Sequence, residues 1–197
     1  MLPQFRLPRF LRRAAQTAAI VLASLIPAHS PVRADAVPVD LELVLAVDVS
    51  LSMDPDEQKL QRDGYVEALK DPEVIAAIRA NALGRIGVVY LEWAGSGIHK
   101  VTVPWSVIDG PAAAGTFADR LAQAPIMRAQ RTSITGALKV AEGLFDTSGF
   151  KGKRRVIDVS GDGPNNDGAP VAQTRDALVA KGITINGLVI LSDVPLP

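Results

Sequence analysis

The stretch from Leu41 to Ser52, LELVLAVDVSLS, decides how the rest of this 197-residue sequence is interpreted. Its first seven residues form a nearly continuous apolar run, which is typical of a strand covered on both faces in a parallel sheet. Oxygen-bearing side chains then alternate at Asp48, Ser50 and Ser52. Alternate residues of an extended segment point to the same side, so the sequence predicts a metal-binding loop at the end of a buried strand.

Strand-like and helix-like segments alternate after this stretch. Three further apolar runs predict strands at Arg85–Trp93, Arg155–Ser160 and Ile183–Leu191. Helices are expected at Asp54 to about Lys70, Gly110–Gln123, Thr135–Phe145 and Ala169–Lys181. The segment His99–Val107 contains Pro104, which confines it to an edge of the sheet. This order predicts a doubly wound α/β fold with a mostly parallel central sheet, one antiparallel edge strand and helices on both faces.

The start of the first helix is marked by local signals. Asp54 is placed to cap it, Pro55 occupies the first helical position, and Glu57 stands at the third, which is a capping-box arrangement. Asp71-Pro72 should break or restart the helix, because a proline disfavours helical geometry in the residue before it.

Three polar clusters fall where ligand sites of such sheets lie, beyond the carboxyl ends of the strands. They are Asp48, Ser50 and Ser52 after the first strand, Thr132, Ser133 and Thr135 before a helix, and Asp162 after the strand ending at Ser160. Each alone also fits a turn or a helix cap, and capping is the favoured role for Thr132 taken alone. Together they offer only oxygen ligands with few carboxylates, which favours Mg²⁺, with Mn²⁺ and Ca²⁺ as the other candidates.

The segments that carry these clusters resemble a known site. Leu43–Ser52 (LVLAVDVSLS), Arg131–Leu138 (RTSITGAL) and Val156–Gly163 (VIDVSGDG) look like the metal-ion-dependent adhesion site, or MIDAS, of von Willebrand factor A-type domains. More narrowly, they resemble a proteobacterial periplasmic branch of that superfamily, in which the last motif reads SGDG. The resemblance covers roughly residues 39 to 191. It implies a von Willebrand A-like, Rossmann-like fold and an adhesion-type domain that performs no enzymatic chemistry.

The resemblance also implies a ligand set. Ser50 and Ser52 would ligate the ion through their hydroxyls, and Asp48 and Asp162 directly or through water. Thr132 is the expected remaining ligand. A protein partner would complete the coordination with an Asp or Glu side chain.

One ligand position stays open between two residues. Many family members place threonine three residues before the helix-opening glycine, and that spacing selects Ser133 before Gly136. Other members space it further, which selects Thr132. We take Thr132 as the ligand and keep Ser133 as the alternative.

The end of the chain departs from the family pattern. A von Willebrand A-type fold normally continues with another strand and a final helix, whereas this chain stops at Pro197. The sheet is therefore expected to lack its last strand and helix, or the chain to be truncated. Either case would leave apolar surface exposed near Ile183–Leu191.

An enzyme is the alternative function. The segment Ser160–Asp167, SGDGPNND, also looks like the magnesium motif of haloacid-dehalogenase-type phosphatases, with Lys139 or Lys153 as the required lysine. Those enzymes use an aspartate two residues after the nucleophile as general acid. This chain has Ser50 at that position, so we favour the non-enzymatic function.

The first 34 residues differ from the rest. Four arginines precede an apolar run from Ala14 to Ile26, and no acidic residue occurs before Asp35. This is the outline of a signal peptide, and Val32-Arg33-Ala34 offers a cleavage site. The apolar run is shorter than a membrane span requires. We therefore expect cleavage after Ala34 and a mature domain, residues 35–197, that is periplasmic or secreted and has no membrane span.

Composition narrows the classes of partner and chemistry. Loss of the leader removes five arginines and leaves 16 basic against 21 acidic residues. A mildly acidic domain argues against a nucleic-acid partner, which would favour a basic face. The absence of cysteine excludes disulfides and a thiol nucleophile.

Several single residues receive structural roles. His99, the only histidine after the leader, is expected to be solvated. Trp93, Trp105, Tyr90 and Tyr65 are expected to pack in or near the core. Asp158 lies in an apolar strand, where a buried carboxylate needs partners, so we expect it to hydrogen-bond beneath the metal site.

Overall fold

The computed structural model describes residues 35–190; the expected signal peptide, residues 1–34, and residues 191–197 lie outside the described part. The strands are β1 (Val37–Asp48), β2 (Ile86–Trp93), β3 (His99–Ile108), β4 (Phe150–Gly161) and β5 (Ile183–Val189). The helices are α1 (Pro55–Lys70), α2 (Pro72–Arg79), α3 (Pro111–Gln123), α4 (Ile134–Asp146) and α5 (Val171–Ala180). No helix among residues 35–190 is long and apolar enough to cross a membrane.

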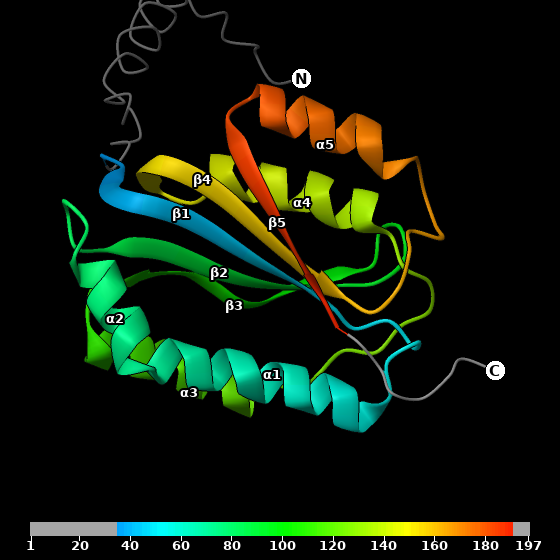
Figure 1. The fold of residues 1–197 in the computed structure, drawn as a ribbon, viewed down its shortest axis with the longest axis horizontal. Helices are drawn as coiled ribbons and strands as arrows, with labels where there is room; N and C mark the ends of the chain where they lie inside the picture. The colour runs from blue at the N-terminus through cyan, green and yellow to red at the C-terminus, as the bar shows by residue number, and fades with distance from the viewer. Residues whose placement is uncertain (1–34, 191–197) are drawn as a thin grey trace, which may run out of the picture. The chain divides into compact units, whose positions relative to one another are not determined.

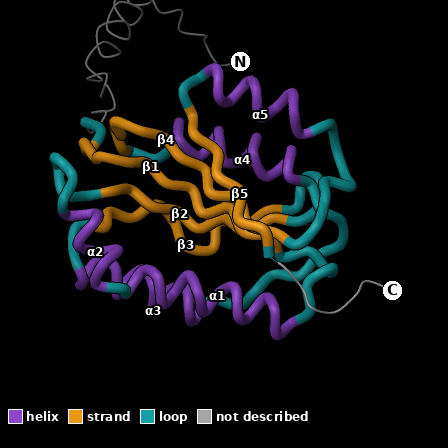
Figure 2. The backbone as a smooth tube through the Cα atoms, viewed as in Figure 1, coloured by secondary structure: helices purple, strands orange, loops and turns teal. Residues whose placement is uncertain are grey.

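The five strands form one sheet in the order β3-β2-β1-β4-β5. Strand β1 is parallel to β2 and β4, β4 is parallel to β5, and β3 alone is antiparallel. Helices α1, α2 and α3 cover one face and α4 and α5 the other (Figures 1 and 2). The predicted α/β fold with one antiparallel edge strand is confirmed. Both α5 and β5 are in place, and a strand after β5 would involve residues beyond the described part.

The central strands are apolar because both of their faces are covered. Every residue of β2 is buried. Tyr90 faces the helices α1 and α3 and belongs to the hydrophobic cluster that contains Phe117, whereas Trp93 faces α4 and belongs to the cluster that contains Leu138. Alternation along one strand thus supplies two hydrophobic layers. The core positions expected for Tyr90 and Trp93 are confirmed.

The remaining aromatic residues and the histidine also lie as expected. Tyr65 is half-buried and meets the Tyr90 ring edge-on, with 5.5 Å between the ring centroids. Trp105 is half-buried against Phe145. The side chain of His99 is exposed.

Helix α1 begins where the capping box was predicted. Asp54 Oδ1 accepts the backbone N–H groups of Asp56 and Glu57, each at 2.8 Å. Glu57 Oε2 in turn accepts the backbone N–H of Asp54 at 2.8 Å. The chain breaks at Asp71, which caps α2 as the proline that follows starts the new helix. The capping box therefore fixes the first turn of α1 directly after the predicted metal loop.

Among residues 35–190, Asp158 makes no hydrogen bond to the residues of the metal loop, so the expected support from Asp158 is wrong. Its carboxylate is half-buried and accepts a hydrogen bond from Asn186 Nδ2 at 2.7 Å. Asn186 is its partner in the β4–β5 register. The carboxylate lines a pocket between the sheet and α1 together with Tyr65 and Ala68, and because it is only half-buried it keeps contact with solvent.

A buried ion pair joins α1 to the sheet and to the loop after α3. The guanidinium of Arg62 pairs with the carboxylate of Glu92, and both side chains are buried. Arg62 Nη1 also donates to the carbonyl oxygens of Leu121 and Ala124, at 2.8 and 3.0 Å. The second oxygen of Glu92 accepts the backbone N–H of Met127 at 3.4 Å. One ion pair thus holds α1, β2 and the start of the loop that leads to Thr132.

Removal of one partner from this pair should be costly. We expect Glu92→Ala to lower the free energy of unfolding by about 3 to 5 kcal/mol, because it leaves a buried guanidinium without its counter-charge. Lys59→Ala, which breaks the exposed Lys59–Asp63 pair on the same helix, should cost less than about 1 kcal/mol. Urea unfolding of both variants measures the difference. Equal losses would show that the buried pair does not hold these elements together.

Candidate functional site

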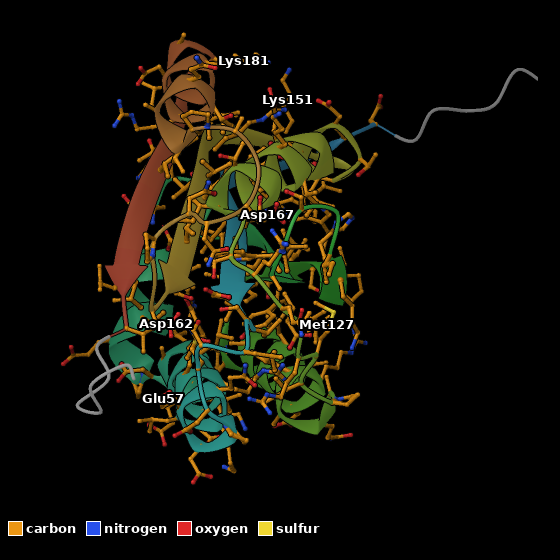
Figure 3. All side chains as sticks on the ribbon, turned by 90° about the vertical axis from the view of Figure 1, so that its right-hand side faces the viewer. Glu57, Met127, Lys151, Asp162, Asp167 and Lys181 are labelled. Atoms are coloured by element: carbon orange, nitrogen blue, oxygen red, sulfur yellow. The ribbon has the colours of Figure 1, made fainter. Side chains whose placement is uncertain are left out.

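The predicted polar clusters meet at the carboxyl ends of β1 and β4. Parallel strands end at the same edge of a sheet, so the loops that follow them lie side by side. Figure 3 views this end of the molecule, with Asp162 and Asp167 on the loop after β4 and Glu57 at the start of α1. The loop before α4, which carries Thr132, joins them through a backbone bond from Asn166 N–H to the Thr132 carbonyl oxygen at 2.9 Å.

Four of the five predicted metal residues form a continuous chain of contacts. Asp48 Oδ1 accepts the backbone N–H of Ser50 at 2.7 Å. The hydroxyl oxygens of Ser50 and Ser52 lie 2.8 Å apart, within hydrogen-bond distance. The Ser52 hydroxyl then donates to Asp162 Oδ1 at 2.8 Å. The structure therefore brings together residues that are 110 positions apart in sequence.

The second oxygen of Asp48 has an unusual position. The residue is fully buried, and Oδ2 has no hydrogen-bond partner among the described residues. The oxygen faces Gly161, where an added Cβ would come within 2.9 Å of it, so glycine is needed to leave it room. A buried carboxylate oxygen without a partner is costly, and an adjacent cation would remove that cost.

The electrostatic surroundings of Asp48 also favour a cation beside its carboxylate. Burial raises the pKa of its carboxyl to about 6, against the lowering effect of the Ser50 hydrogen bonds, and the negative charge of Asp162 raises it further. A nearby carboxylate without a counter-charge disfavours ionisation of Asp48. A divalent cation held by Asp48 would reverse that effect, so the donor set suits such an ion.

The composition of the set distinguishes it from other metal sites. Within residues 35–190 there is no group of three or more His, Cys, Asp or Glu side chains that could hold a metal. The candidate set has two carboxylates and is otherwise made of hydroxyls. It resembles an oxygen site for a hard cation that keeps water or outside ligands, and differs from a closed zinc or calcium site.

Thr132 and Ser133 have different surroundings, although both are buried. Ser133 caps α4, since its hydroxyl accepts the backbone N–H of Gly136 at 3.2 Å. It also lies 3.1 Å from the hydroxyl of Ser96. Thr132 is held by its backbone, whose N–H donates to Asn166 Oδ1 at 2.8 Å. The Thr132 hydroxyl has no hydrogen-bond partner among residues 35–190.

The loop after β4 carries three clamping side chains that were not predicted from the sequence. Asn166 fixes Thr132, and Asn165 Oδ1 accepts the backbone N–H of Thr135 at 3.3 Å. Asp167 Oδ2 accepts the backbone N–H of Ser96 at 2.7 Å, and this bond holds the pKa of Asp167 below its ordinary value. The run Asn-Asn-Asp before Gly168 signals side chains that bond to backbone. It does not reveal which backbone groups they reach.

Helix α1 supplies a second set of contacts that were not predicted. Gln58 Nε2 donates to the Ser50 carbonyl oxygen at 3.0 Å. Gln61 Nε2 and the Tyr65 hydroxyl both donate to Ser160 Oγ, at 3.0 and 3.1 Å. The spacing of three and four residues places these side chains on one face of the helix. One helix face therefore supports both the loop after β1 and the end of β4.

The loop between α3 and α4 is tied to the metal loop by backbone bonds. Ala129 N–H donates to the Val49 carbonyl oxygen at 3.3 Å, and Leu51 N–H donates to the Ala129 carbonyl oxygen at 2.9 Å. Arg128 Nη2 adds a bond to the Met53 carbonyl oxygen at 3.1 Å. The positions of Ser50 and Ser52 are therefore fixed from both sides.

The chain matches one protein family and is similar in fold to solved structures. The family described as Protein of unknown function (DUF1194) matches residues 38–195, and no curated protein matches the chain. Proximal thread matrix protein 1 from the mussel byssus, in a structure with a zinc-occupied MIDAS motif, is similar at a TM-score of 0.56 and 21% identity. That alignment covers 77% of this chain and 37% of the mussel protein.

A bacterial structure gives the same result for the fold. The von Willebrand factor type A structure from Catenulispora acidiphila is similar at a TM-score of 0.52 and 16% identity, over 76% of this chain and 33% of that one. This chain therefore spans well under half the length of either protein. At such identities the similarity concerns the fold, which is von Willebrand factor A-like. The match over residues 38–195 shows that the chain belongs to the family described as Protein of unknown function (DUF1194).

Proposed function

We propose that this chain is an adhesion-type domain that captures a protein partner through a divalent ion held in a MIDAS. The proposed ligands are Asp48, Ser50, Ser52, Thr132 and Asp162. The observation that carries the proposal is the buried Oδ2 of Asp48, which has no hydrogen-bond partner in the described part of the chain and stands at the start of a contact chain that ends on Asp162. The zinc-occupied MIDAS of the similar mussel protein supports it.

Mg²⁺ is the ion that the donor set favours, with Mn²⁺ and Ca²⁺ as alternatives. Hard oxygen donors suit all three, and a set with few carboxylates suits the smaller ions, which retain water. Two carboxylates together with neutral hydroxyls would leave the bound ion attractive to an outside anion. An Asp or Glu side chain of a partner protein is the anion we propose.

Thr132 is the ligand we propose from the loop before α4. Its hydroxyl has no hydrogen-bond partner among residues 35–190, whereas that of Ser133 caps α4 and contacts Ser96. A residue already used as a helix cap would lose that bond on turning towards an ion.

The alternative function, a magnesium-dependent phosphatase, has little support in the geometry. Lys153 pairs with Asp40, at 3.2 Å, near the opposite end of β1 from Asp48. Lys139 is exposed on α4. The position of the general acid is occupied by Ser50, whose hydroxyl contacts Ser52. We therefore propose that the domain is not an enzyme.

Export is the proposed location, from the leader pattern in residues 1–34 and cleavage after Ala34. The periplasm is the favoured compartment, and secretion is the alternative. A proteobacterial periplasmic branch of the von Willebrand A superfamily is the proposed origin. Its basis is the SGDG motif at Ser160–Gly163.

The metal proposal predicts a matched pair of results. We expect Asp162→Asn to weaken Mg²⁺ or Mn²⁺ binding at least about tenfold, since even outer partners of metal ligands have effects of that size. Asp158→Asn makes the same chemical change four residues earlier on β4, where the carboxylate accepts a hydrogen bond from Asn186, and should leave binding unchanged. Titration calorimetry on both variants gives the measurement. Equal affinities in the two would exclude Asp162 from the site.

The same samples test the carboxylate partner. Acetate should lower the water-proton relaxation caused by Mn²⁺ on the purified protein, because it displaces water from the ion, and acetamide should not. If both or neither act, the ion does not select carboxylates.

Two neighbouring substitutions separate Thr132 from Ser133. Thr132→Val should weaken Mn²⁺ binding with little change in stability, because its hydroxyl supports no bond within the described fold. Ser133→Ala should leave binding nearly unchanged but cost about 1 kcal/mol in unfolding free energy, through loss of the α4 cap. The reverse pattern would assign the ligand to Ser133.

Ionisation of the buried Asp48 carboxylate should lower the stability of the metal-free protein. The folded-state pKa of this carboxyl, about 6, exceeds the ordinary 3.8, so ionisation destabilises the metal-free fold. That cost is absent below about pH 4, grows between pH 4 and 6, and is complete at pH 7. Asp48→Asn should therefore stabilise the metal-free protein by about 2 to 3 kcal/mol at pH 7 and hardly at all at pH 4. Thermal unfolding with chelator at both pH values shows this, and a destabilised variant at pH 7 would contradict it.

A further inference from the structure

A strained arginine stands directly before the proposed ligand Thr132. Among residues 35–190, Arg131 is the only residue other than glycine that has a positive φ, at 68°. This left-handed conformation is costly for a residue with a side chain, because Cβ crowds the carbonyl oxygen that follows it. Strained residues persist where the surrounding structure holds them, and they cluster at binding sites. The conformation of Arg131 therefore indicates a functional position.

Backbone contacts on both sides hold Arg131 in this conformation. Ala129 bonds through its backbone to the loop after β1. The N–H of Ser133 donates to the Ala94 carbonyl oxygen, at the end of β2, at 2.8 Å. Gly95 lies against the same turn, since an added Cβ there would come within 3.2 Å of the Arg131 Cβ. The strain is therefore imposed by loops that converge at the site.

The strained turn directs two neighbouring side chains differently. Thr132 is only 3% exposed, whereas the side chain of Arg131 is exposed. Consecutive Cα atoms lie about 3.8 Å apart, so the arginine side chain begins beside the proposed ligand and extends into solvent. Arg131 therefore brings a guanidinium to the rim of the site, within reach of a molecule bound to the ion.

The positive charge of Arg131 lies near the loop after β4, which also carries Asp162. The pKa of Asp167 on that loop is below its ordinary value, chiefly because its carboxylate accepts the Ser96 N–H, and the charge of Arg131 contributes. Among the described residues, however, the Arg131 guanidinium forms no ion pair. Its capacity to pair with a carboxylate is not used within the described fold.

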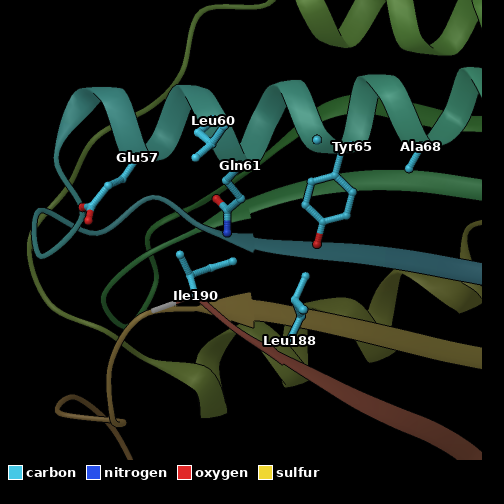
Figure 4. Close-up of a pocket in the computed structure, with 8 residues that line it drawn as sticks. Glu57, Leu60, Gln61, Tyr65, Ala68, Leu188 and Ile190 are labelled. Atoms are coloured by element: carbon cyan, nitrogen blue, oxygen red, sulfur yellow. The ribbon is translucent and has the colours of Figure 1, made fainter. Parts of the chain in front are cut away.

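The α1 side of the site has the opposite charge. Asp54 caps α1, and Asp56 and Glu57 lie in its first turn. Glu57 turns its carboxylate back towards the loop before the helix (Figure 4). Figure 3 shows Glu57 well separated from Asp167 at this end of the molecule. A partner that lies across the site would therefore meet negative charge at α1 and positive charge at Arg131.

We propose that Arg131 binds a second carboxylate of the partner, beside the carboxylate that completes the coordination of the ion. This inference rests on the proposed function, because it assumes that a carboxylate binds the ion. The planar guanidinium matches a carboxylate in both charge and geometry. The fixed backbone of Arg131 limits the freedom lost on binding. The partner segment would thus carry two acidic groups, and the second would be directed away from α1.

Glutarate and its monoamide, glutaramate, are matched probes, because they have the same length and differ by one carboxylate. With the ion site saturated, both should lower the water-proton relaxation caused by Mn²⁺ on the purified protein. We expect glutarate to act at about tenfold lower concentration. About fivefold corresponds to one exposed ion pair, and the remainder is the statistical advantage of two identical carboxylates. Titrations of Mn²⁺ without protein correct for chelation by glutarate.

Arg131→Gln should reduce the difference between the probes to the statistical advantage alone. Arg79→Gln removes the same charge from an exposed position on α2, at the opposite end of the sheet from the site (Figure 1), and should preserve the full difference. Arg131→Gly provides a second variant, because glycine adopts a positive φ without strain. It should also lose the difference, and its melting temperature should not fall.

Three results would overturn the proposal. If the unaltered protein shows only the statistical advantage, Arg131 binds no second carboxylate, although capture of a single carboxylate would stand. If the difference is lost in Arg131→Gln but kept in Arg131→Gly, the first substitution acts through the backbone. If neither probe changes the relaxation, the proposed capture of carboxylates fails, and the role of Arg131 fails with it.

Discussion

The site depends on one constraint, the buried carboxylate of Asp48, of which only one oxygen has a hydrogen-bond partner among the described residues. Folding has to bear this cost because Asp48 sits at the end of β1, the central strand of the sheet. Such local costs typically mark functional positions, where stability is given up for binding.

The surroundings of Asp48 hold the neighbouring ligands at the same end of the sheet. Helix α1 reaches the loop after β1 through Gln58 and the end of β4 through Gln61 and Tyr65. The Arg62–Glu92 pair on the same helix anchors the loop that leads to Thr132. Few of these contacts involve a proposed ligand side chain directly. The site is therefore held mainly by helix and backbone contacts, and the hydroxyls remain available.

The fold could be predicted from sequence because its signals are local and repeated. Apolar runs such as Leu41–Val47, the capping box at Asp54 and Pro104 in the edge strand each have one structural meaning, and the structure agrees with all three. The grouping of Asp48, Ser50, Ser52 and Asp162 followed from topology, since loops after neighbouring parallel strands must meet.

Other features could not be predicted, because they depend on which distant groups lie opposite. Asp158 looked buried from its apolar neighbours, yet its side chain is only half-buried and bonds to Asn186 on the neighbouring strand. Asn166 and Asp167 have the composition of a turn, and their contacts with Thr132 and Ser96 arise only when three loops converge. Among the described residues the Thr132 hydroxyl makes no hydrogen bond, whereas that of Ser133 caps α4. This difference likewise results from packing and is not evident from their adjacent positions in sequence.

The first turn of α1 has a consequence for when a partner could bind. Asp54, Asp56 and Glu57 are clustered there, directly after the Ser52 loop, and Asp162 contacts Ser52 from the other side. Without a cation this rim is negative and repels an approaching carboxylate. If the site takes its ion as proposed, the local field changes sign at the one point where a carboxylate would arrive. The acidic rim would then prevent a partner carboxylate from binding until the ion is in place.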